Sequence, residues 1–344
     1  MSSQPNILII YTGGTIGMIK NPLSGALAPF DFETISDRIP ELQLLDCSIK
    51  TFSFDKPIDS SDMEPKYWIE IAEIIELNYD NTDGFVVLHG SDTMSYTASA
   101  LSFMLENLSK PVILTGSQLP IGDLRTDAKE NLITSIHLAS LRKGNTSYIQ
   151  EVGLYFEYKL YRGNRTTKIN AEHFEAFDSP NYPHLAESGV HLNVQEAFLF
   201  RPDPTQTLVV HRKLNTDIGV LKLFPGISKS VLQGVLTSKL FKGLIIETYG
   251  AGNATSSDWF IKLLSLAIKR GLKVVNVTQC IAGSVRMGEY ETSAKLKEVG
   301  VISGGDMTTE TAVTKLMFLL GSEVTDSEFK KSFETAICGE ITQN

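Results

Sequence analysis

Short apolar runs alternate with longer amphipathic stretches along most of the chain. The runs "NILIIY", "GFVVLHG", "KPVILTG" and "EVGLYF" have the length of strands and are rich in branched and aromatic residues. The stretches between them repeat their apolar residues with the period of a helix. This alternation predicts an α/β fold whose sheets are mainly parallel.

The amphipathic stretches place their apolar side chains three or four positions apart, as one face of a helix requires. These residues are Trp68, Ile71, Ala72 and Ile75 in the first stretch, and Met94, Ala98, Leu101 and Leu105 in the second. A further helix is predicted around residues 131–141. Such helices would connect successive parallel strands, which cannot be joined by a tight turn.

The periodicity lapses between about residues 196 and 217, where "RPDPTQT" and "RKLNTD" introduce proline and polar residues. Proline and clustered polar residues are typical of connections between elements. We therefore predict a larger α/β domain over residues 1–195, a linker over 196–217 and a smaller α/β domain over 218–344.

Apolar runs resume after this segment. "GVLKLFPG", "GLIIETYG" and "KVVNVTQC" read as strands, and the last two flank a helix face formed by Phe260, Leu263, Leu264 and Ala267. A final helix is predicted over residues 308–320. Thr308 or Thr309 would cap this helix and Gly321 would end it.

The charge balance limits the class of partner. The 344 residues include 31 lysine and arginine residues and 40 aspartate and glutamate residues, which give a formal net charge of −9. An acidic protein repels nucleic acid and anionic membrane surfaces, so we expect neither as a partner. A small-molecule substrate fits this balance better.

Histidine and cysteine form no metal-binding pattern. The six histidines lack H-x-x-x-H and H-E-x-x-H spacings, and the three cysteines, Cys47, Cys280 and Cys338, lie far apart. We therefore expect no metal, no disulfide framework and a reducing compartment. The start, "MSSQPNILII", shows no signal-peptide pattern and no run of 18 apolar residues occurs, so a cytoplasmic protein is expected.

Hydroxyl and acidic residues gather directly after four of the predicted strands. They occupy residues 12–15, 59–62, 89–93 and 115–118. Ligands of open α/β sheets bind outside the carboxyl ends of the strands, so these positions are candidates for chemistry.

The stretch "TGGTIG", residues 12–17, matches neither the phosphate-binding pattern G-x-x-x-x-G-K-[ST] nor the dinucleotide pattern G-x-G-x-x-G. "GAGNAT", residues 250–255, lacks the third glycine of the dinucleotide pattern. Paired glycines after a strand often form only a turn. The alternative is that Thr12 and Thr15 flank a turn whose free N–H groups form an oxyanion hole beside a hydroxyl nucleophile.

The motifs "DSSDM" and "HGSDTM" precede predicted helices, where short acids and hydroxyls often serve only as caps. Hydroxyls and free N–H groups at a helix start also suit a carboxylate, whereas Asp59 and Asp62 would suit an ammonium group. A ligand with both charges, such as an amino acid, would use both. Lys168 is either solvated or buried beside Ser91 and Asp92, where it would relay protons for a hydroxyl nucleophile.

Five motifs in this order, "TGGTIGM", "DSSDM", "HGSDTM", "TGSQLP" and "YRGNRTTK", resemble those of the bacterial L-asparaginase family. "ETYGAGN", "QCIAGSV" and "GGDMTTETAVTKL" extend the resemblance over nearly the whole chain, and it is closest to the cytoplasmic type I branch. The resemblance implies hydrolysis of L-asparagine to L-aspartate and ammonia without a cofactor. It also implies a larger N-terminal domain that carries the site and assembly into a homodimer or homotetramer.

The resemblance assigns catalytic roles to matching positions in this chain. Thr15 would be the nucleophile that attacks the side-chain amide of the substrate and becomes acylated. Ser91, Asp92 and Lys168 would form a second group that assists proton transfer.

The resemblance also assigns the substrate-binding positions. Ser60, Ser61 and Asp92 would hold the α-carboxylate and α-ammonium groups, and Ser117 would line the pocket. Gly14, next to Gly13, would let the substrate approach the backbone closely.

Three positions depart from the family pattern. Ser91 stands where members usually have threonine, which keeps the hydroxyl but loses the methyl group that restricts its rotamer. Ala26 or Leu27 stands where a flap tyrosine is common. Glu247 replaces an arginine of a regulatory asparagine site found in some type I members, so we expect that regulation to be absent or altered.

Other functions fit the same motifs. One is an amidohydrolase that prefers glutamine, or an amidotransferase subunit that releases ammonia for another enzyme. Another is a non-catalytic amino-acid sensor. One methylene in a pocket discriminates by only about 1–3 kcal/mol, so the sequence does not separate asparagine from glutamine as the substrate.

Overall fold

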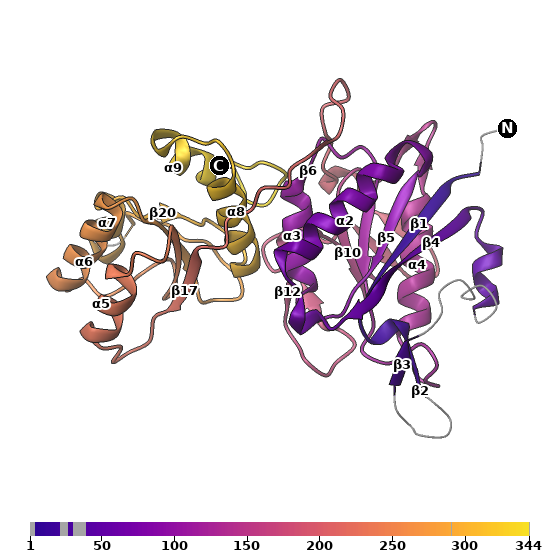
Figure 1. Ribbon diagram of the computed structural model, residues 1–344, viewed down its shortest axis with the longest axis horizontal. Helices are drawn as coiled ribbons and strands as arrows, with labels where there is room; N and C mark the ends of the chain where they lie inside the picture. Colours follow the sequence, from indigo (N-terminus) through magenta and orange to yellow (C-terminus); the bar gives the residue numbers. More distant parts are fainter. Residues whose placement is uncertain (1–3, 21–26, 30–38, 290, 344) are drawn as a thin grey trace. The chain divides into compact units, whose positions relative to one another are not determined.

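The computed structural model of this protein describes residues 4–20, 27–29, 39–289 and 291–343. The chain divides into two compact units, Met1–Arg212 and Lys213–Asn344, each built around its own sheet (Figure 1). Both sheets are mainly parallel, as the alternation of apolar runs and amphipathic stretches predicts.

An eight-stranded sheet forms the first unit, in the order β15-β14-β11-β10-β7-β5-β1-β4. Five neighbouring strands of this sheet pair in parallel, namely β4, β1, β5, β7 and β10. At one edge, β11, β14 and β15 add antiparallel partners. Their bounds are β1 (Asn6–Gly13), β4 (Ser48–Ile58), β5 (Gly84–Leu88), β7 (Val112–Thr115), β10 (Val152–Phe156), β11 (Lys159–Arg162), β14 (Ala186–Ser188) and β15 (Leu192–Val194).

Helices cover both faces of this sheet. α2 (Pro65–Asn78) and α3 (Met94–Met104) lie side by side on one face, and α4 (Ala128–Ser140) covers the other (Figure 1). Successive side chains of β1 alternate between the faces, and Ile7 and Ile9 belong to the core cluster that includes Leu132 and Ile136 of α4. Burial on both faces explains why the strands read as continuous apolar runs.

Short elements complete the first unit. They are η1 (Thr15–Gly17), β2 (Met18–Lys20), β3 (Leu27–Pro29), η3 (Pro40–Leu44), η4 (Ser60–Asp62), η5 (Tyr79–Asn81), β6 (Leu105–Glu106), β8 (Arg142–Lys143), β9 (Thr146–Ser147), η6 (Gly163–Arg165), β12 (Thr167–Lys168), β13 (Phe177–Asp178), η7 (Glu196–Phe198) and β16 (Val209–Val210).

Part of the segment predicted as a linker packs on the first unit. β16 pairs with β6, and the Arg212 guanidinium bonds the carboxylates of Glu73 and Glu76 on α2. The division between the units at Lys213 falls inside the predicted 196–217 segment.

The second unit contains a parallel sheet in the order β17-β18-β19-β20. Its strands are β17 (Ile218–Lys222), β18 (Gly243–Thr248), β19 (Lys273–Thr278) and β20 (Ile302–Ser303). Its helices are α5 (Lys229–Thr237), α6 (Asp258–Lys269), α7 (Glu291–Glu298), α8 (Thr309–Gly321) and α9 (Asp326–Glu334). Thr308 caps α8 by accepting a hydrogen bond from the Thr311 N–H, and the helix continues through Gly321 to a C-cap at Ser322.

A buried ion pair fixes the end of the chain to α8. The Lys315 ammonium is fully buried, pairs with the Glu340 carboxylate and donates to the carbonyls of Phe333 and Thr335 at 2.7 Å. Burial lowers the pKa of Lys315, and the Glu340 carboxylate opposes this shift. Because a buried charge is tolerated only when it is paired, these bonds hold residues 333–340 against the helix.

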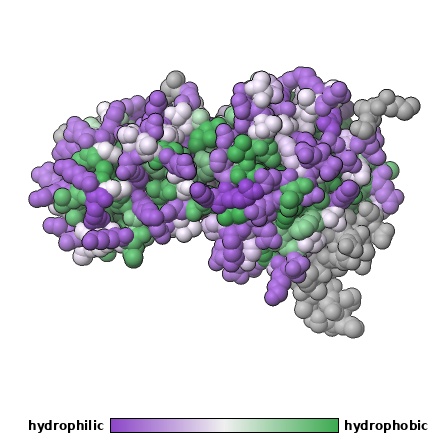
Figure 2. Space-filling view, turned by 45° about the horizontal axis from the view of Figure 1, so that its top comes forward, coloured by the Kyte–Doolittle hydropathy of each residue, from purple (hydrophilic) through white to green (hydrophobic). Residues whose placement is uncertain are grey.

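Hydrophilic side chains cover most of the visible face of each unit, with apolar side chains exposed among them (Figure 2). The exposed apolar residues include Leu124 and Val190 in the first unit and Leu240 in the second. Among the helices of the described residues, none combines the length and the hydropathy needed to cross a bilayer.

Candidate active site

The carboxyl ends of β7, β5, β1 and β4 lie next to one another in the sheet. Tyr11 of β1 pairs with Leu88 of β5, and Gly13 pairs with Ile58 of β4. The polar motifs predicted as candidates follow these ends directly. The topology therefore brings residues 12–15, 59–62, 89–93 and 115–118 to one edge of the sheet.

Close backbone approach at this edge requires glycine in the first motif. Gly13 has φ +143° and Gly14 has φ +86°, a region that L side chains rarely adopt. A Cβ atom on Gly13 would lie 2.1 Å from the Ile58 carbonyl oxygen, and one on Gly14 would lie 2.5 Å from the Gly90 nitrogen. This glycine turn places Thr15, which is half-buried, as the first residue of η1.

The second motif packs against the third. A Cβ on Gly90 would lie 2.5 Å from the hydroxyl of Ser60, which is itself buried, and Thr93 donates to the Ser60 carbonyl at 2.7 Å. Asp59 accepts hydrogen bonds from the N–H and the hydroxyl of Ser61, and these bonds lower the pKa of Asp59. Asp59 therefore caps the single turn η4, so the capping alternative holds for this turn but not for α2, which begins at Pro65.

An ion pair joins the third motif to Lys168 of β12. The Lys168 ammonium donates to the Ser91 hydroxyl at 2.8 Å and to Asp92 Oδ1 at 2.7 Å. The side chain of Lys168 is 17% exposed and that of Asp92 is 63% exposed. Because the N-cap of α3 is Thr93, without a side-chain cap bond, the capping alternative for Ser91 and Asp92 does not hold.

A buried hydrogen-bonded chain leads from α2 to the Gly90 carbonyl. Trp68 Nε1 donates to the Thr97 hydroxyl at 2.9 Å. The same hydroxyl oxygen lies 2.9 Å from His89 Nε2, and His89 Nδ1 lies 2.6 Å from the Gly90 carbonyl oxygen. A carbonyl only accepts, so Nδ1 carries the proton and Nε2 accepts from Thr97. Desolvation by complete burial lowers the pKa of His89 to about 4, which keeps the imidazole neutral.

This burial predicts a pH dependence of stability. The folded-state pKa of His89 lies below the unfolded value of about 6.5, so its contribution to stability is complete above pH 6.5 and is lost as the pH falls toward 4. Between pH 7 and pH 5 we expect the free energy of unfolding to fall by about 2 kcal/mol more in the wild type than in His89→Asn. Urea unfolding of both proteins at both pH values measures the difference. Equal losses in the two proteins would contradict the assignment.

The fourth motif is anchored by a buried network. Ser117 is 3% exposed and its hydroxyl donates to the Leu119 carbonyl at 2.6 Å, while the Asp127 carboxylate accepts from the N–H groups of Gln118 and Leu119. Burial raises the pKa of Asp127. With its proton engaged, the Ser117 oxygen offers only lone pairs to a ligand.

Two family models match the sequence. "Asparaginase, N-terminal" covers residues 6–199 and "Glutaminase/Asparaginase C-terminal domain" covers residues 217–333. The chain belongs to the asparaginase family. It is 45% identical to "L-asparaginase 1" of Escherichia coli (strain K12), over 98% of both chains. The resemblance that the motifs indicate is therefore confirmed.

Solved structures and a second kind of relative extend this placement in the asparaginase family. The structure of L-asparaginase I from Vibrio cholerae matches with a TM-score of 0.89 and 41% identity, over 99% of this chain and 100% of that chain. A glutamyl-tRNA(Gln) amidotransferase component of Pyrococcus abyssi is 36% identical, over 98% of this chain and 77% of that protein. The predicted two-domain, mainly parallel α/β fold is thus the fold of the family.

Two positions that depart from the family pattern have different outcomes in the structure. Ala26 lies outside the described residues. For Leu27 only the backbone is described: it belongs to β3 and pairs with Lys20 of β2. Glu247 on β18 accepts a hydrogen bond from the Thr309 hydroxyl at 2.8 Å and lies 3.6 Å from the Lys222 ammonium. A carboxylate at this position is therefore held by the first turn of α8.

Among the described residues, no hydrogen bond joins Thr15 to Ser91, Asp92 or Lys168. Thr15 and the Ser91, Asp92 and Lys168 group lie near each other because β1 and β5 end at the same edge of the sheet and Gly14 packs against the Gly90 backbone. The sequence reasoning missed the His89 chain and the Asp127 network. The "HG" of "HGSDTM" was a usable signal for the first, because a histidine at the end of a buried strand needs internal partners.

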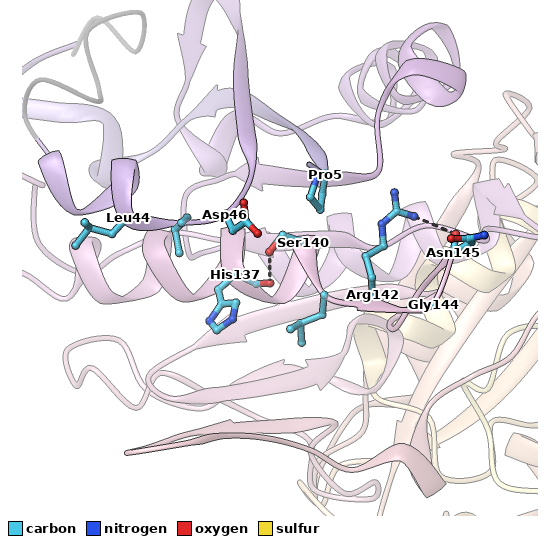
Figure 3. A pocket seen from close by; sticks show the side chains of 10 residues that line it. Pro5, Leu44, Asp46, His137, Ser140, Arg142, Gly144 and Asn145 are labelled. Atoms are coloured by element: carbon cyan, nitrogen blue, oxygen red, sulfur yellow. Dashed lines mark hydrogen bonds between the residues drawn. The ribbon is translucent and has the colours of Figure 1, made fainter. Parts of the chain in front are cut away.

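A cavity of about 620 Å³ in the first unit lies away from this edge (Figure 3). Pro5 and Asp46, which precede β1 and β4, line it together with His137, Ser140 and Arg142. The amino ends of parallel strands lie opposite their carboxyl ends. This cavity is therefore not part of the candidate active site.

Proposed function

We propose that this chain hydrolyses L-asparagine to L-aspartate and ammonia, without a cofactor, through an acyl-enzyme on Thr15. The proposal is carried by the ion pair of Lys168 with Asp92 and the hydrogen bond of Lys168 to Ser91, at a sheet edge shared with the glycine turn before Thr15. Family membership and the asparaginase names of the relatives support the same reaction.

The reaction has two steps. In the first, the Thr15 oxygen attacks the side-chain amide carbon and passes its proton to the Ser91 oxygen, while Ser91 passes its own proton on to the amide nitrogen. The C–N bond then breaks and the nitrogen leaves as ammonia. In the second, water attacks the resulting ester, the Thr15 oxygen recovers a proton and L-aspartate leaves. Splitting one difficult displacement into two easier ones is the advantage of a covalent intermediate.

Lys168 controls the proton on Ser91. Since the ammonium donates to the Ser91 oxygen, the hydroxyl proton of Ser91 points elsewhere and is available to the reacting groups. The limited exposure of Lys168 strengthens these charge-assisted bonds. A loss of Lys168 would therefore disorder the hydroxyl as well as remove the charge.

The substrate's zwitterion would be held by complementary groups. Asp92 uses Oδ1 for Lys168, and its second carboxylate oxygen is left for the α-ammonium group. Ser60 and Ser61, in the turn η4, would bind the α-carboxylate, and the Ser117 oxygen would accept a donor from the substrate. Gly14 would let the substrate approach the backbone.

Assembly and location complete the proposal. A homodimer or homotetramer is proposed from the family resemblance, and a cytoplasmic location from the cysteines. Among the described residues, Cys47, Cys280 and Cys338 form no disulfide, and Cys280 is exposed, which suits a reducing compartment.

Ammonia release from L-asparagine and L-glutamine, measured in parallel with the purified protein, tests the proposed substrate. We expect kcat/KM to be about 10–200-fold higher for asparagine, since the two differ by one methylene. A preference for glutamine would favour the amidotransferase-type alternative. Tight binding of asparagine in a calorimeter without ammonia release would favour a sensor and contradict the proposed reaction.

A further inference from the structure

A second cavity, of about 470 Å³, lies entirely within the second unit. It is placed at the amino ends of β18 and β19, where the C-terminal ends of α6 and α8 and the start of α9 also meet. Phe241, Leu272 and Leu320 supply its apolar surface. Neither the family resemblance nor the proposed reaction uses this cavity.

Four basic residues from two segments of the chain line it: Lys239 and Lys242 before β18, and Arg270 and Lys273 at the turn between α6 and β19. Two of them have carboxylate partners. Lys273 pairs with Asp326 at 2.6 Å, and Lys242 pairs with Asp217 at 3.3 Å. The Asp326 side chain is 91% exposed, so water competes with its ion pair and Asp326 is readily displaced from Lys273.

The other two cations are not neutralised by a carboxylate. The Arg270 guanidinium donates to the carbonyls of Leu236 and Ser238, at 2.8 and 3.0 Å, which satisfies N–H groups but leaves the positive charge. Lys239 is exposed, and its ammonium has no hydrogen-bond or ion-pair partner among the described residues. Helix capping explains Arg270 but not the three lysines, because Lys239 and Lys242 lie between α5 and β18 and Lys273 is the first residue of β19.

The second unit has a different charge balance from the chain as a whole. Residues 213–344 contain fifteen lysine and arginine residues against thirteen aspartate and glutamate residues, whereas the whole chain has 31 against 40. The acidic excess therefore lies in the first unit. A small anion meets an attractive field at the cavity rather than the repulsion expected of the protein as a whole.

We propose that this cavity binds a small molecule with two or more closely spaced anionic groups, such as an organic phosphate or a polycarboxylate. Lys239 and Arg270 contact the anion directly, and Lys273 joins them when Asp326 moves away into solvent. The apolar surface of Phe241, Leu272 and Leu320 accepts the carbon skeleton of the ligand. The volume suits a ligand of metabolite size.

Calorimetric titration of the full chain with pyrophosphate and with citrate tests the site, since the two probes separate phosphate from carboxylate chemistry. We expect at least one to bind, and Lys239→Glu to raise its Kd about tenfold or more. Lys262→Glu is the matched control, because Lys262 is exposed on α6 outside the cavity and the charge change is the same. Its Kd is expected to stay within about twofold of the wild type.

A second variant makes the opposite prediction. Asp326→Asn removes the carboxylate that occupies Lys273, so the bound probe should bind about threefold or more tighter than to the wild type. Glu323→Gln, an exposed acid outside the cavity, changes the net charge equally and should have no comparable effect.

The readout is binding, so it is independent of the proposed amide hydrolysis. Failure of both probes to bind the wild type at millimolar concentration would overturn the proposal. Equal weakening by Lys239→Glu and Lys262→Glu would also overturn it, because the attraction would then be general and not local.

Discussion

Replacing Thr15 with alanine is expected to lower kcat for ammonia release by at least about 10³-fold, because the variant lacks the oxygen that forms the acyl-enzyme. Thr15 is half-buried after a turn built on Gly13 and Gly14, and its side chain makes no hydrogen bond to the described residues. The variant should therefore fold as the wild type does. Steady-state ammonia release, with circular dichroism and thermal unfolding as folding checks, measures the effect.

Thr12 provides a matched control on the other side of the same glycines. Its hydroxyl donates to the Leu88 carbonyl at 2.9 Å and it is 1% exposed, so it serves the fold. Thr12→Val should lower the free energy of unfolding by about 1–3 kcal/mol while the folded protein stays active. Thr15→Ser, which keeps the oxygen, should retain measurable turnover. An active Thr15→Ala variant would exclude Thr15 as the nucleophile.

Replacing Lys168 with methionine is expected to lower kcat by about 10²–10⁴-fold, the usual range for loss of a group that assists proton transfer. The methionine keeps the apolar stem but lacks the ammonium group that donates both hydrogen bonds. Ser91 and Asp92 therefore lose the partner that fixes their side chains. If Asp92 also binds the substrate ammonium, KM should rise in the same variant. Initial rates over a range of asparagine concentrations separate the two effects.

Lys159→Met is the control for this change, because Lys159 is half-buried on β11, and β10 and β7 separate β11 from β5, the strand that precedes Ser91 and Asp92. It should leave kcat within about twofold of the wild type, as expected for a residue outside the site. Ser91→Thr restores the residue usual in the family and should keep the activity, since the hydroxyl remains. Unchanged turnover in Lys168→Met would remove Lys168 from the mechanism.

Much of the fold follows from apolar periodicity. The predicted face of Trp68, Ile71, Ala72 and Ile75 is buried on α2, and the strands "GFVVL" and "GLIIET" are β5 and β18. These elements are buried on one or both sides, so their patterns are strong. The helix predicted around 131–141 is α4, which begins earlier, at Ala128.

The antiparallel edge of the first sheet could not be predicted. β10 and β11 form a hairpin through Glu157 and Tyr158, which have φ of 45° and 68°. A turn with two positive φ values is usually marked by asparagine or glycine, and neither is present here. The Asn131 side chain, distant in sequence, accepts from the Glu157 N–H and helps to hold this turn.

The candidate site was predictable in its parts but not in its connections. Strand-end position selects Ser60, Ser91 and Ser117, because parallel strands end at one edge. The distances from Lys168 depend on β12, which lies 76 residues beyond Asp92, and no local pattern reports such a contact. The tautomer of His89 likewise depends on Thr97 and Gly90 together.

Competition by hydroxylamine during asparagine turnover tests the central claim, an acyl-enzyme on Thr15, most directly. Hydroxylamine attacks an ester intermediate in place of water, so the wild type should form the β-hydroxamate of aspartate in proportion to the hydroxylamine added, and Thr15→Ala should form none. Continued release of ammonia with aspartate as the only product would show direct attack by water and contradict the account.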